Sequence, residues 1–257
     1  MQTMFRSAHL CASAVGLALF TTAAQADGPG QEGQGASWSL GLGVGSETSP
    51  YRGVDTETKA LPVLAFENAH VRLFGPSLDV KLPSTGAVSW ALRARYSDQG
   101  YKASDAAELA GMAERKGGFW LGGRADWRQP WGQLSGEWLA DASDRSGGQQ
   151  FKLEASQRFP LGGVSVRPHI GLVWQDRSMV DYYYGVGQQE SRPGRAAYAG
   201  KSTLNTELGL QVMVPLAPGH SVMMGLTHTL LGSGIKNSPL VDRSGVSAVR
   251  AAYIFRF

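Results

Sequence analysis

The sequence predicts an all-β protein, a transmembrane antiparallel up-and-down β-barrel that follows a cleaved signal peptide. Three observations predict this fold class. The last segment of the chain, residues 245–257, alternates with a period of two over roughly ten residues, which is the length of one strand tilted across a bilayer. The chain also begins with an export signal. After this signal, no stretch has the roughly 20 apolar residues of a membrane-spanning helix.

The carboxyl-terminal segment is the clearest strand. Tyr253, Phe255 and Phe257 occupy alternate positions, and Arg250 and Arg256 fall between them on the opposite face. Aromatic rings on one face and arginines on the other fit a strand with a lipid side and a hydrated side. A soluble sheet also alternates, but it seldom ends a chain in this way. We therefore predict that Tyr253, Phe255 and Phe257 form the barrel-assembly signal.

Residues 1–26 have the pattern of a secretory signal peptide. Arg6 supplies the positive start, residues 10–24 are apolar, and Ala24 and Ala26 flank a small-residue cleavage site. A permanent membrane anchor is the alternative. It is disfavoured because the apolar run is short for a spanning helix and a cleavage site follows it.

Two regions are predicted after the cleavage site. Residues 27–36 are rich in Gly and Gln and should be a flexible lead-in, and residues 37–257 should be the barrel. The chain has one cysteine, Cys11, so the processed protein would have none. Closed hydrogen-bond ladders make disulfides unnecessary in such a barrel.

The composition supports a barrel and argues against other classes. A mean hydropathy of −0.18 is too polar for a helical membrane protein, whereas a barrel hides half of its residues from lipid. The 34 glycines among 257 residues exceed the usual share of about 7% and suit turns and crowded strand faces. The net charge of +3 is not concentrated in a basic run, so nucleic acid is not an expected partner. Outer-membrane lipid is an expected partner because the predicted fold is a transmembrane barrel.

The alternation predicts about 12 strands, with about 10 as the alternative because the first third of the chain is less regular. In the second half the connections alternate between short and long, as the periplasmic turns and outer loops of a barrel do. Within one long connection, residues 105–115 are predicted to form a short helix capped by Asp105. The predicted strands are residues 37–46, 60–67, 71–82 with a break at Gly75 and Pro76, 87–97, 118–129, 133–143, 151–159, 164–174, 204–214, 222–230 and 245–257.

The strand faces opposite the apolar ones collect charged side chains, and two interpretations compete. In the first, the charges pair across strands and fill a narrow lumen. In the second, a basic excess lines a water-filled pore that favours anions. A barrel of about 12 strands has little interior space once long arginines fill it, which favours the first. The predicted lumen charges are Arg93, Arg95, Arg124, Asp126, Arg128, Glu137, Lys152, Glu154, Arg158, Arg167, Glu207, Arg250 and Arg256.

The residues give little support for catalysis. A serine-histidine hydrolase needs a histidine beside a serine nucleophile and an orienting polar group. His228 lies between Thr227 and Thr229, and His220 precedes Ser221 beside a short turn, on the side where such sites are not expected. No pair of histidines has metal-ligand spacing. We therefore predict a protein that is not an enzyme and has no metal or cofactor.

Four loop motifs occur in a fixed order along the chain. They are Ser-Pro-Tyr-Arg-Gly at 49–53, Leu-Ala-Gly-Met-Ala-Glu-Arg at 109–115, Tyr-Tyr-Gly-Val at 183–186 and Ser-Pro-Leu-Val at 238–241. Together with the closing residues 253–257, these motifs resemble the MipA/OmpV family of outer-membrane proteins. The resemblance covers essentially the whole processed chain.

The resemblance implies a barrel in the outer membrane of a Gram-negative bacterium, with no catalytic residues to carry over. It further implies either a scaffold that joins a lytic transglycosylase to a penicillin-binding murein synthase, or a surface adhesin. The alternative function is a small porin-like channel with a weak preference for anions.

Overall fold

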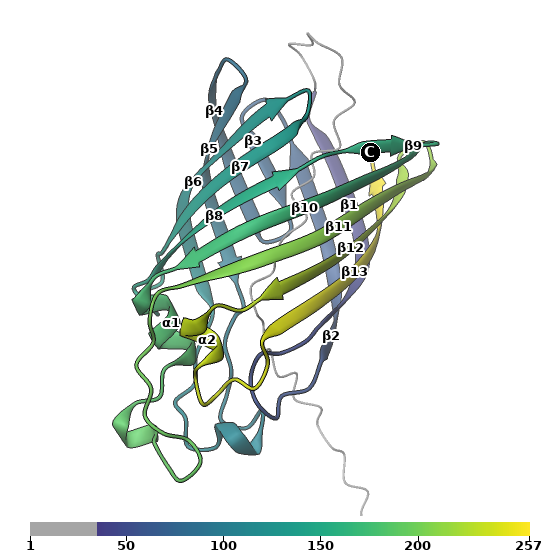
Figure 1. Cartoon of the computed structure of the whole chain (residues 1–257). Helices are drawn as coiled ribbons and strands as arrows, with labels where there is room; N and C mark the ends of the chain where they lie inside the picture. The colour runs from purple at the N-terminus through teal and green to yellow at the C-terminus, as the bar shows by residue number, and fades with distance from the viewer. Residues whose placement is uncertain (1–34) are drawn as a thin grey trace, which may run out of the picture.

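Strands that follow one another in sequence pair antiparallel around the molecule and close into a barrel (Figure 1). The computed structural model describes residues 35–257, so the predicted signal peptide and residues 27–34 of the predicted lead-in lie outside the described residues. β8 and β9 both pair with β10 and occupy one position in the wall, so the wall has 12 strands. The predicted fold class is confirmed. The strands are β1 (Ser37–Glu47), β2 (Glu57–Glu67), β3 (Val71–Phe74), β4 (Ser77–Thr85), β5 (Val88–Ser97), β6 (Gly118–Gln129), β7 (Gly132–Asp141), β8 (Gln149–Ser156), β9 (Phe159–Leu161), β10 (Val164–Gln175), β11 (Thr203–Ala217), β12 (His220–Leu230) and β13 (Gly245–Arg256).

Side chains alternate between the two faces of the wall, as the sequence pattern predicts. On β1, Trp38, Leu40, Leu42 and Val44 are exposed on the outer face. On β13, Val249 and Tyr253 are exposed, whereas Arg250 and Ile254 are buried. An outer face covered by large apolar side chains is the surface that a bilayer requires.

The barrel closes where β1 pairs with β13, and glycines on β1 make this seam possible. Gly41, Gly43 and Gly45 occupy the inward positions of β1, opposite residues of β13. A Cβ atom on Gly43 would lie 2.5 Å from the carbonyl oxygen of Ala251 and 2.7 Å from the Cβ of Ala252. The two strands approach each other so closely that no larger residue fits.

The two ends of the barrel differ. Turns of two or three residues at 68–70, 86–87, 130–131, 162–163 and 218–219 join strands at one end, where the chain also finishes (Figure 1). Long connections at 48–56, 98–117, 176–202 and 231–244 and the shorter 142–148 gather at the other end. Short turns mark the periplasmic side of outer-membrane barrels and long loops the external side.

The long loops contain structure that the sequence did not predict correctly. The expected helix over 105–115 is only a 3₁₀ turn, Ala107–Leu109, and no side chain caps it. The carboxylate of Asp105 instead accepts a hydrogen bond from the N–H of Lys102. The prediction was wrong because Leu109 and Met112 are buried in a cluster shared by several loops, and that packing decides the path of the chain.

Two short helices occur in loops where none was predicted. α1 (Arg177–Tyr184) begins at Asp176, whose carboxylate accepts the N–H of Met179 at 2.8 Å. α2 (Ser233–Lys236) is a single turn between β12 and β13. Within the described residues, no helix has the length and apolar character needed to cross a membrane.

We predict that Gly43→Val destabilises the barrel, because the new side chain meets backbone at the closing seam. The expected loss is about 1–3 kcal/mol or more of unfolding free energy. Urea unfolding in lipid vesicles, followed by tryptophan fluorescence, measures it. Gly136→Val is the matched control, because a Cβ on Gly136 would meet nothing within 4 Å. Equal losses in the two variants would contradict the proposed tight seam.

Candidate functional site

The long loops fold together into a lid over the external end of the barrel, and Tyr51 lies at its centre. The Tyr51 hydroxyl donates a hydrogen bond to the carbonyl oxygen of Tyr183 at 3.2 Å. Its ring packs against Tyr101 and Tyr184, with centroids 4.8 and 5.5 Å away. These tyrosines come from three different loops, so their burial holds the loops together.

The four motifs that carry the family resemblance all meet in this lid. The N–H of Arg52 donates to the carbonyl oxygen of Leu240 at 2.8 Å. The Ser238 hydroxyl donates to the carbonyl oxygen of Tyr184 at 2.6 Å. Leu109 is fully buried in the same cluster. The motifs lie far apart in sequence but form one structure. The sequence shows their order along the chain but not that they contact one another.

Arg115 and Glu190 join two of the lid loops. The Arg115 side chain donates to the carbonyl oxygen of Tyr182 at 2.7 Å and to the Glu190 carboxylate at 3.1 Å. The same carboxylate accepts the N–H of Ala113 at 2.8 Å and the N–H of Gly187 at 3.0 Å. Although burial alone would raise the pKa of the Glu190 carboxyl, these donors outweigh it and hold its pKa below the ordinary value.

The lid tyrosines are not placed to act as acids or bases. Burial raises the pKa of Tyr101 to about 12 and raises the pKa values of Tyr51, Tyr183 and Tyr184 above the ordinary value of 10.0. All four hydroxyls are therefore neutral near pH 7. All four pack in the lid, and the hydroxyls of Tyr51, Tyr183 and Tyr184 also form hydrogen bonds there.

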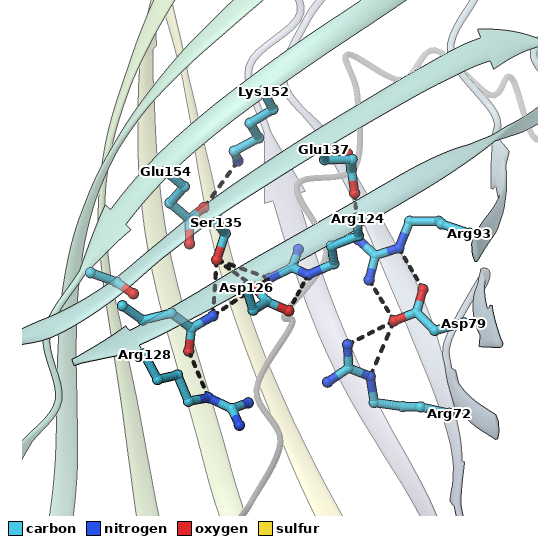
Figure 2. Close-up of polar contacts among 12 residues, drawn as sticks. Arg72, Asp79, Arg93, Arg124, Asp126, Arg128, Ser135, Glu137, Lys152 and Glu154 are labelled. Carbon is cyan, nitrogen blue, oxygen red and sulfur yellow. Dashed lines mark hydrogen bonds and ion pairs between the residues drawn. The ribbon is translucent and has the colours of Figure 1, made fainter. Parts of the chain in front are cut away.

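Below the lid, ion pairs lie along the inner wall, and Arg93 is the centre of the most buried group (Figure 2). Its guanidinium bonds the Asp79 carboxylate at 2.6 Å and also pairs with Glu137. Arg72 pairs with the same Asp79 at 2.7 Å, and Arg95 pairs with the same Glu137. Alternating cations and carboxylates thus link β3, β4, β5 and β7 across the inner wall.

Further groups lie on the inner wall. Arg124 pairs with Asp126 at 2.6 Å, and the Ser135 hydroxyl donates to the same carboxylate at 2.6 Å (Figure 2). Lys152 pairs with Glu154 at 3.2 Å and also with Glu207. Other contacts are Arg167 with Glu154 at 3.1 Å, Arg250 with Glu47 at 3.0 Å, Lys81 with Glu67 at 2.5 Å, and Lys59 with Glu57 and Asp98 at 3.2 Å each.

The structure brings most of the predicted lumen charges together. Arg93, Arg95, Arg124, Asp126, Glu137, Lys152, Glu154, Arg167, Glu207 and Arg250 all take part in the ion pairs described above. Arg128, Arg158 and Arg256 are exposed near the periplasmic end instead. Sequence reasoning missed Glu47, Arg72 and Asp79, which lie in the less regular first third. The alternation of Ser77, Asp79 and Lys81 was the signal for Asp79.

Two cavities that share no lining residue lie inside the barrel. One, of about 100 Å³, lies under the lid and is lined by Arg95, Lys152 and Trp120, among others. The other, of about 270 Å³, opens at the periplasmic end and is lined mainly by apolar groups such as Phe74 and Met223. Met223 and Ile254 form part of a small buried apolar cluster in this half of the barrel.

One histidine lies beside a serine, which the sequence did not reveal. The Nδ1 atom of His228 on β12 is 2.8 Å from the hydroxyl of Ser247 on β13. An acyl-transfer site also needs a group that orients the histidine and donors for the developing oxyanion. No contact within residues 35–257 supplies such a group to His228. Within the same range, no group of three or more potential metal-ligating side chains occurs.

These features together define a class of protein. A closed barrel with an apolar outer face, a charged and filled lumen, short turns at one end and a loop lid at the other is an outer-membrane β-barrel. The chain belongs to the family of MltA-interacting protein MipA, whose family model matches residues 40–257.

The chain is similar to several known proteins. The chain is 26% identical to the MltA-interacting protein of Escherichia coli K12 over 247 residues, which is 95% of this chain and 97% of that protein. It is 27% identical to the outer membrane protein OmpV of Vibrio cholerae over 61% of each chain. A solved outer-membrane channel of Pseudomonas putida F1 aligns over 91% of this chain and 100% of that one, with 14% identity and a TM-score of 0.44. The protein is located in the outer membrane.

We predict that Arg93→Met lowers the unfolding free energy by about 3–5 kcal/mol, because it removes the cation shared by two buried carboxylates. Urea unfolding in vesicles measures this loss. The matched control is Arg128→Met, since Arg128 is exposed and makes one long bond of 3.4 Å to Gln133. If both variants lose the same stability, the central network does not stabilise the barrel.

We predict that the lid loosens in acid because Glu190 becomes protonated. A carboxyl whose pKa is lowered by folding stabilises the fold above its ordinary value of 4.5, and this contribution is lost as the pH falls through the folded value. Hydrogen exchange of residues 107–115 should therefore be slow at pH 7 and faster below about pH 4, after correction for intrinsic rates. Glu190→Gln should remove most of this pH dependence, and Glu114→Gln should keep it. Unchanged protection across the same pH range would refute the prediction.

Proposed function

We propose that this protein is a non-conducting, non-enzymatic barrel that acts as an envelope scaffold and binds a lytic transglycosylase at its periplasmic end. The observation that carries the first part is the lid. Its buried tyrosines cover the external end, and the paired side chains of Arg93 and Lys152 occupy space on the inner wall below it. A continuous water path would have to open the lid.

The charges of the lumen argue against the porin-like alternative with a weak anion preference. A basic excess would favour anions. The paired groups on the inner wall are balanced, with nine cations against nine carboxylates. The cations are Lys59, Arg72, Lys81, Arg93, Arg95, Arg124, Lys152, Arg167 and Arg250, and the carboxylates are Glu47, Glu57, Glu67, Asp79, Asp98, Asp126, Glu137, Glu154 and Glu207.

The partner is proposed from the name of a relative, and the geometry supports a binding surface at the periplasmic end. A relative similar over nearly the whole chain is named for its interaction with MltA. A murein enzyme works in the periplasm, so it can reach the short-turn end of the barrel. At this end Trp131, in the β6–β7 turn, and Leu161, the last residue of β9, are 57% and 60% exposed. Exposed apolar groups of this kind suit a protein-binding surface. A penicillin-binding murein synthase is proposed as the second partner.

The prediction is that the tagged barrel retains a lytic transglycosylase from envelope extract and forms no channel. Leu161→Arg should reduce the retained enzyme at least fivefold, because a charge replaces an exposed apolar contact at the periplasmic end. Lys102→Glu, at the lid end, is the control and should retain it fully. Planar-bilayer recordings of the same preparation should show no stable current steps.

Two results would count against this function. Recovery of no murein enzyme in several extracts would remove the scaffold role while leaving the closed lumen intact. Regular single-channel steps that scale with salt concentration would instead favour the channel.

A further inference from the structure

The barrel wall is incomplete beside the external half of β2. β3 has four residues and pairs with β2 only at Ala65–Glu67. The β3–β4 turn begins where the N–H of Gly75 donates to the carbonyl oxygen of Leu64 at 2.9 Å. Residues 57–63 of β2 continue beyond this turn and pair with β1 on one side only. The wall therefore has a notch, which we call the β2–β5 notch, bounded by residues 57–63, the turn at 75–76 and the end of β5.

The edge of the notch has backbone groups without a strand partner. Successive residues of a strand direct their backbone groups to opposite sides, and Leu64 directs its carbonyl toward β3. Thr58, Ala60 and Pro62 share this direction, so they face the notch. Pro62 has no N–H to leave unpaired, which suits an edge position. The same proline disfavours an added strand at this edge, since it cannot donate to a ladder.

The β2–β5 notch lies within the apolar belt of the barrel. Ala60 and Pro62 pair with Val44 and Leu42, which are both exposed on the outer face. Across the notch, the exposed ring of Tyr96 packs against Phe119 at a centroid distance of 5.2 Å. Lipid-exposed sheet edges with unsatisfied backbone groups are not tolerated in hydrocarbon. A molecule or chain segment with polar groups must therefore bind along this edge of β2.

The notch leads to the cavity under the lid. Tyr96 and Ser97, at the end of β5, line that cavity, and so does Glu47 at the end of β1. The side chain of Lys59 on β2 spans the opening and pairs with Asp98, just after β5, at 3.2 Å. Lys59 also pairs with Glu57 on its own strand at 3.2 Å. In a complete wall β2 and β5 are three strand spacings apart, about 14 Å, so this ion pair stands where strands are missing.

Unsatisfied polar atoms lie at the inner mouth of the notch. The Nε of Arg95, which lines the cavity, is buried and has no hydrogen-bond partner within residues 35–257. The hydroxyl of Ser77 is also buried without a partner in that range, and Ser77 is paired with Arg95 across β4 and β5. Two buried donors without acceptors are costly unless an acceptor arrives.

We propose that the β2–β5 notch is a side portal through which an amphipathic molecule enters from the outer leaflet and binds in the cavity under the lid. The apolar part of the molecule lies against Tyr96 and the lipid. Its head carries hydrogen-bond acceptors, such as a carboxylate or phosphate, which accept from the side chain of Arg95. The bound molecule also lies against the unpaired backbone edge of β2. A closed lid and a non-conducting lumen are compatible with this site, because entry is lateral.

The test uses a cysteine placed in the cavity away from the notch. A chain that starts at residue 27 has no cysteine, because the only one is Cys11. Thr229→Cys lies on β12 and lines the cavity. The folded variant in phosphatidylcholine vesicles is treated with an N-octyl maleimide or with a charged, membrane-impermeant maleimide. The octyl reagent is expected to label at least tenfold faster.

Two substitutions change the portal in opposite directions. Ser97→Trp in the Thr229→Cys background should slow octyl labelling at least tenfold by filling the opening. Lys59→Ala should speed it severalfold by removing the side chain that spans the opening. Ala140→Trp, outward on β7, is the matched control and should change nothing. Heat-modifiability on gels confirms folding in each case, and Lys59→Ala keeps the test decisive if the tryptophan variant fails to fold.

The head group is tested by protection. Dodecanoate and dodecyl phosphate should each slow the labelling of the cavity cysteine, whereas dodecyltrimethylammonium and inorganic phosphate should not. The stronger protector identifies the carboxylate or the phosphate class. Equal labelling by both maleimides, or no effect of Ser97→Trp and Lys59→Ala, would overturn the portal. Efficient cross-linking between two copies through Thr58→Cys would also overturn it and assign the edge to a second chain.

Discussion

The structure depends on one constraint, which is that backbone N–H and C=O groups within a bilayer must find partners inside the protein. Pairing of β13 with β1 satisfies this constraint by turning a sheet with two edges into a closed wall. The inward glycines of β1 let the two strands approach, and the outward apolar side chains meet lipid. At the β2–β5 notch the same constraint is not met by strand pairing, which is why we propose a ligand there.

Closure of the wall also places charged side chains in a narrow interior, where they must be paired with one another. Arginine and glutamate side chains that point into a narrow lumen lose water, so each must be paired. Arg93, shared by Asp79 and Glu137, shows how one cation can satisfy two carboxylates from different strands. The pairs therefore join strands that are not neighbours, and they add rigidity across the lumen.

The lid has a different physical basis, because it lies beyond the membrane and is a small hydrophobic core. Tyr51 and Leu240 are buried as deeply as residues of a soluble domain. Motifs that looked like isolated loop signatures are the parts of this core. The sequence could place them in order, but it could not show that Tyr51 packs on Tyr184 or that Arg115 reaches Glu190.

The sequence by itself determined the fold class, the inward and outward faces and most of the lumen charges. These follow from the period of two along a strand, which is a local property of the chain. Only the tertiary structure decided which charges meet, how the loops form a lid and where the four-residue β3 leaves the wall open. Those outcomes depend on strand register and on contacts between distant residues, such as Arg250 and Glu47, which are 203 positions apart. No local pattern records such contacts, because the physical forces that select them act only once the barrel has closed.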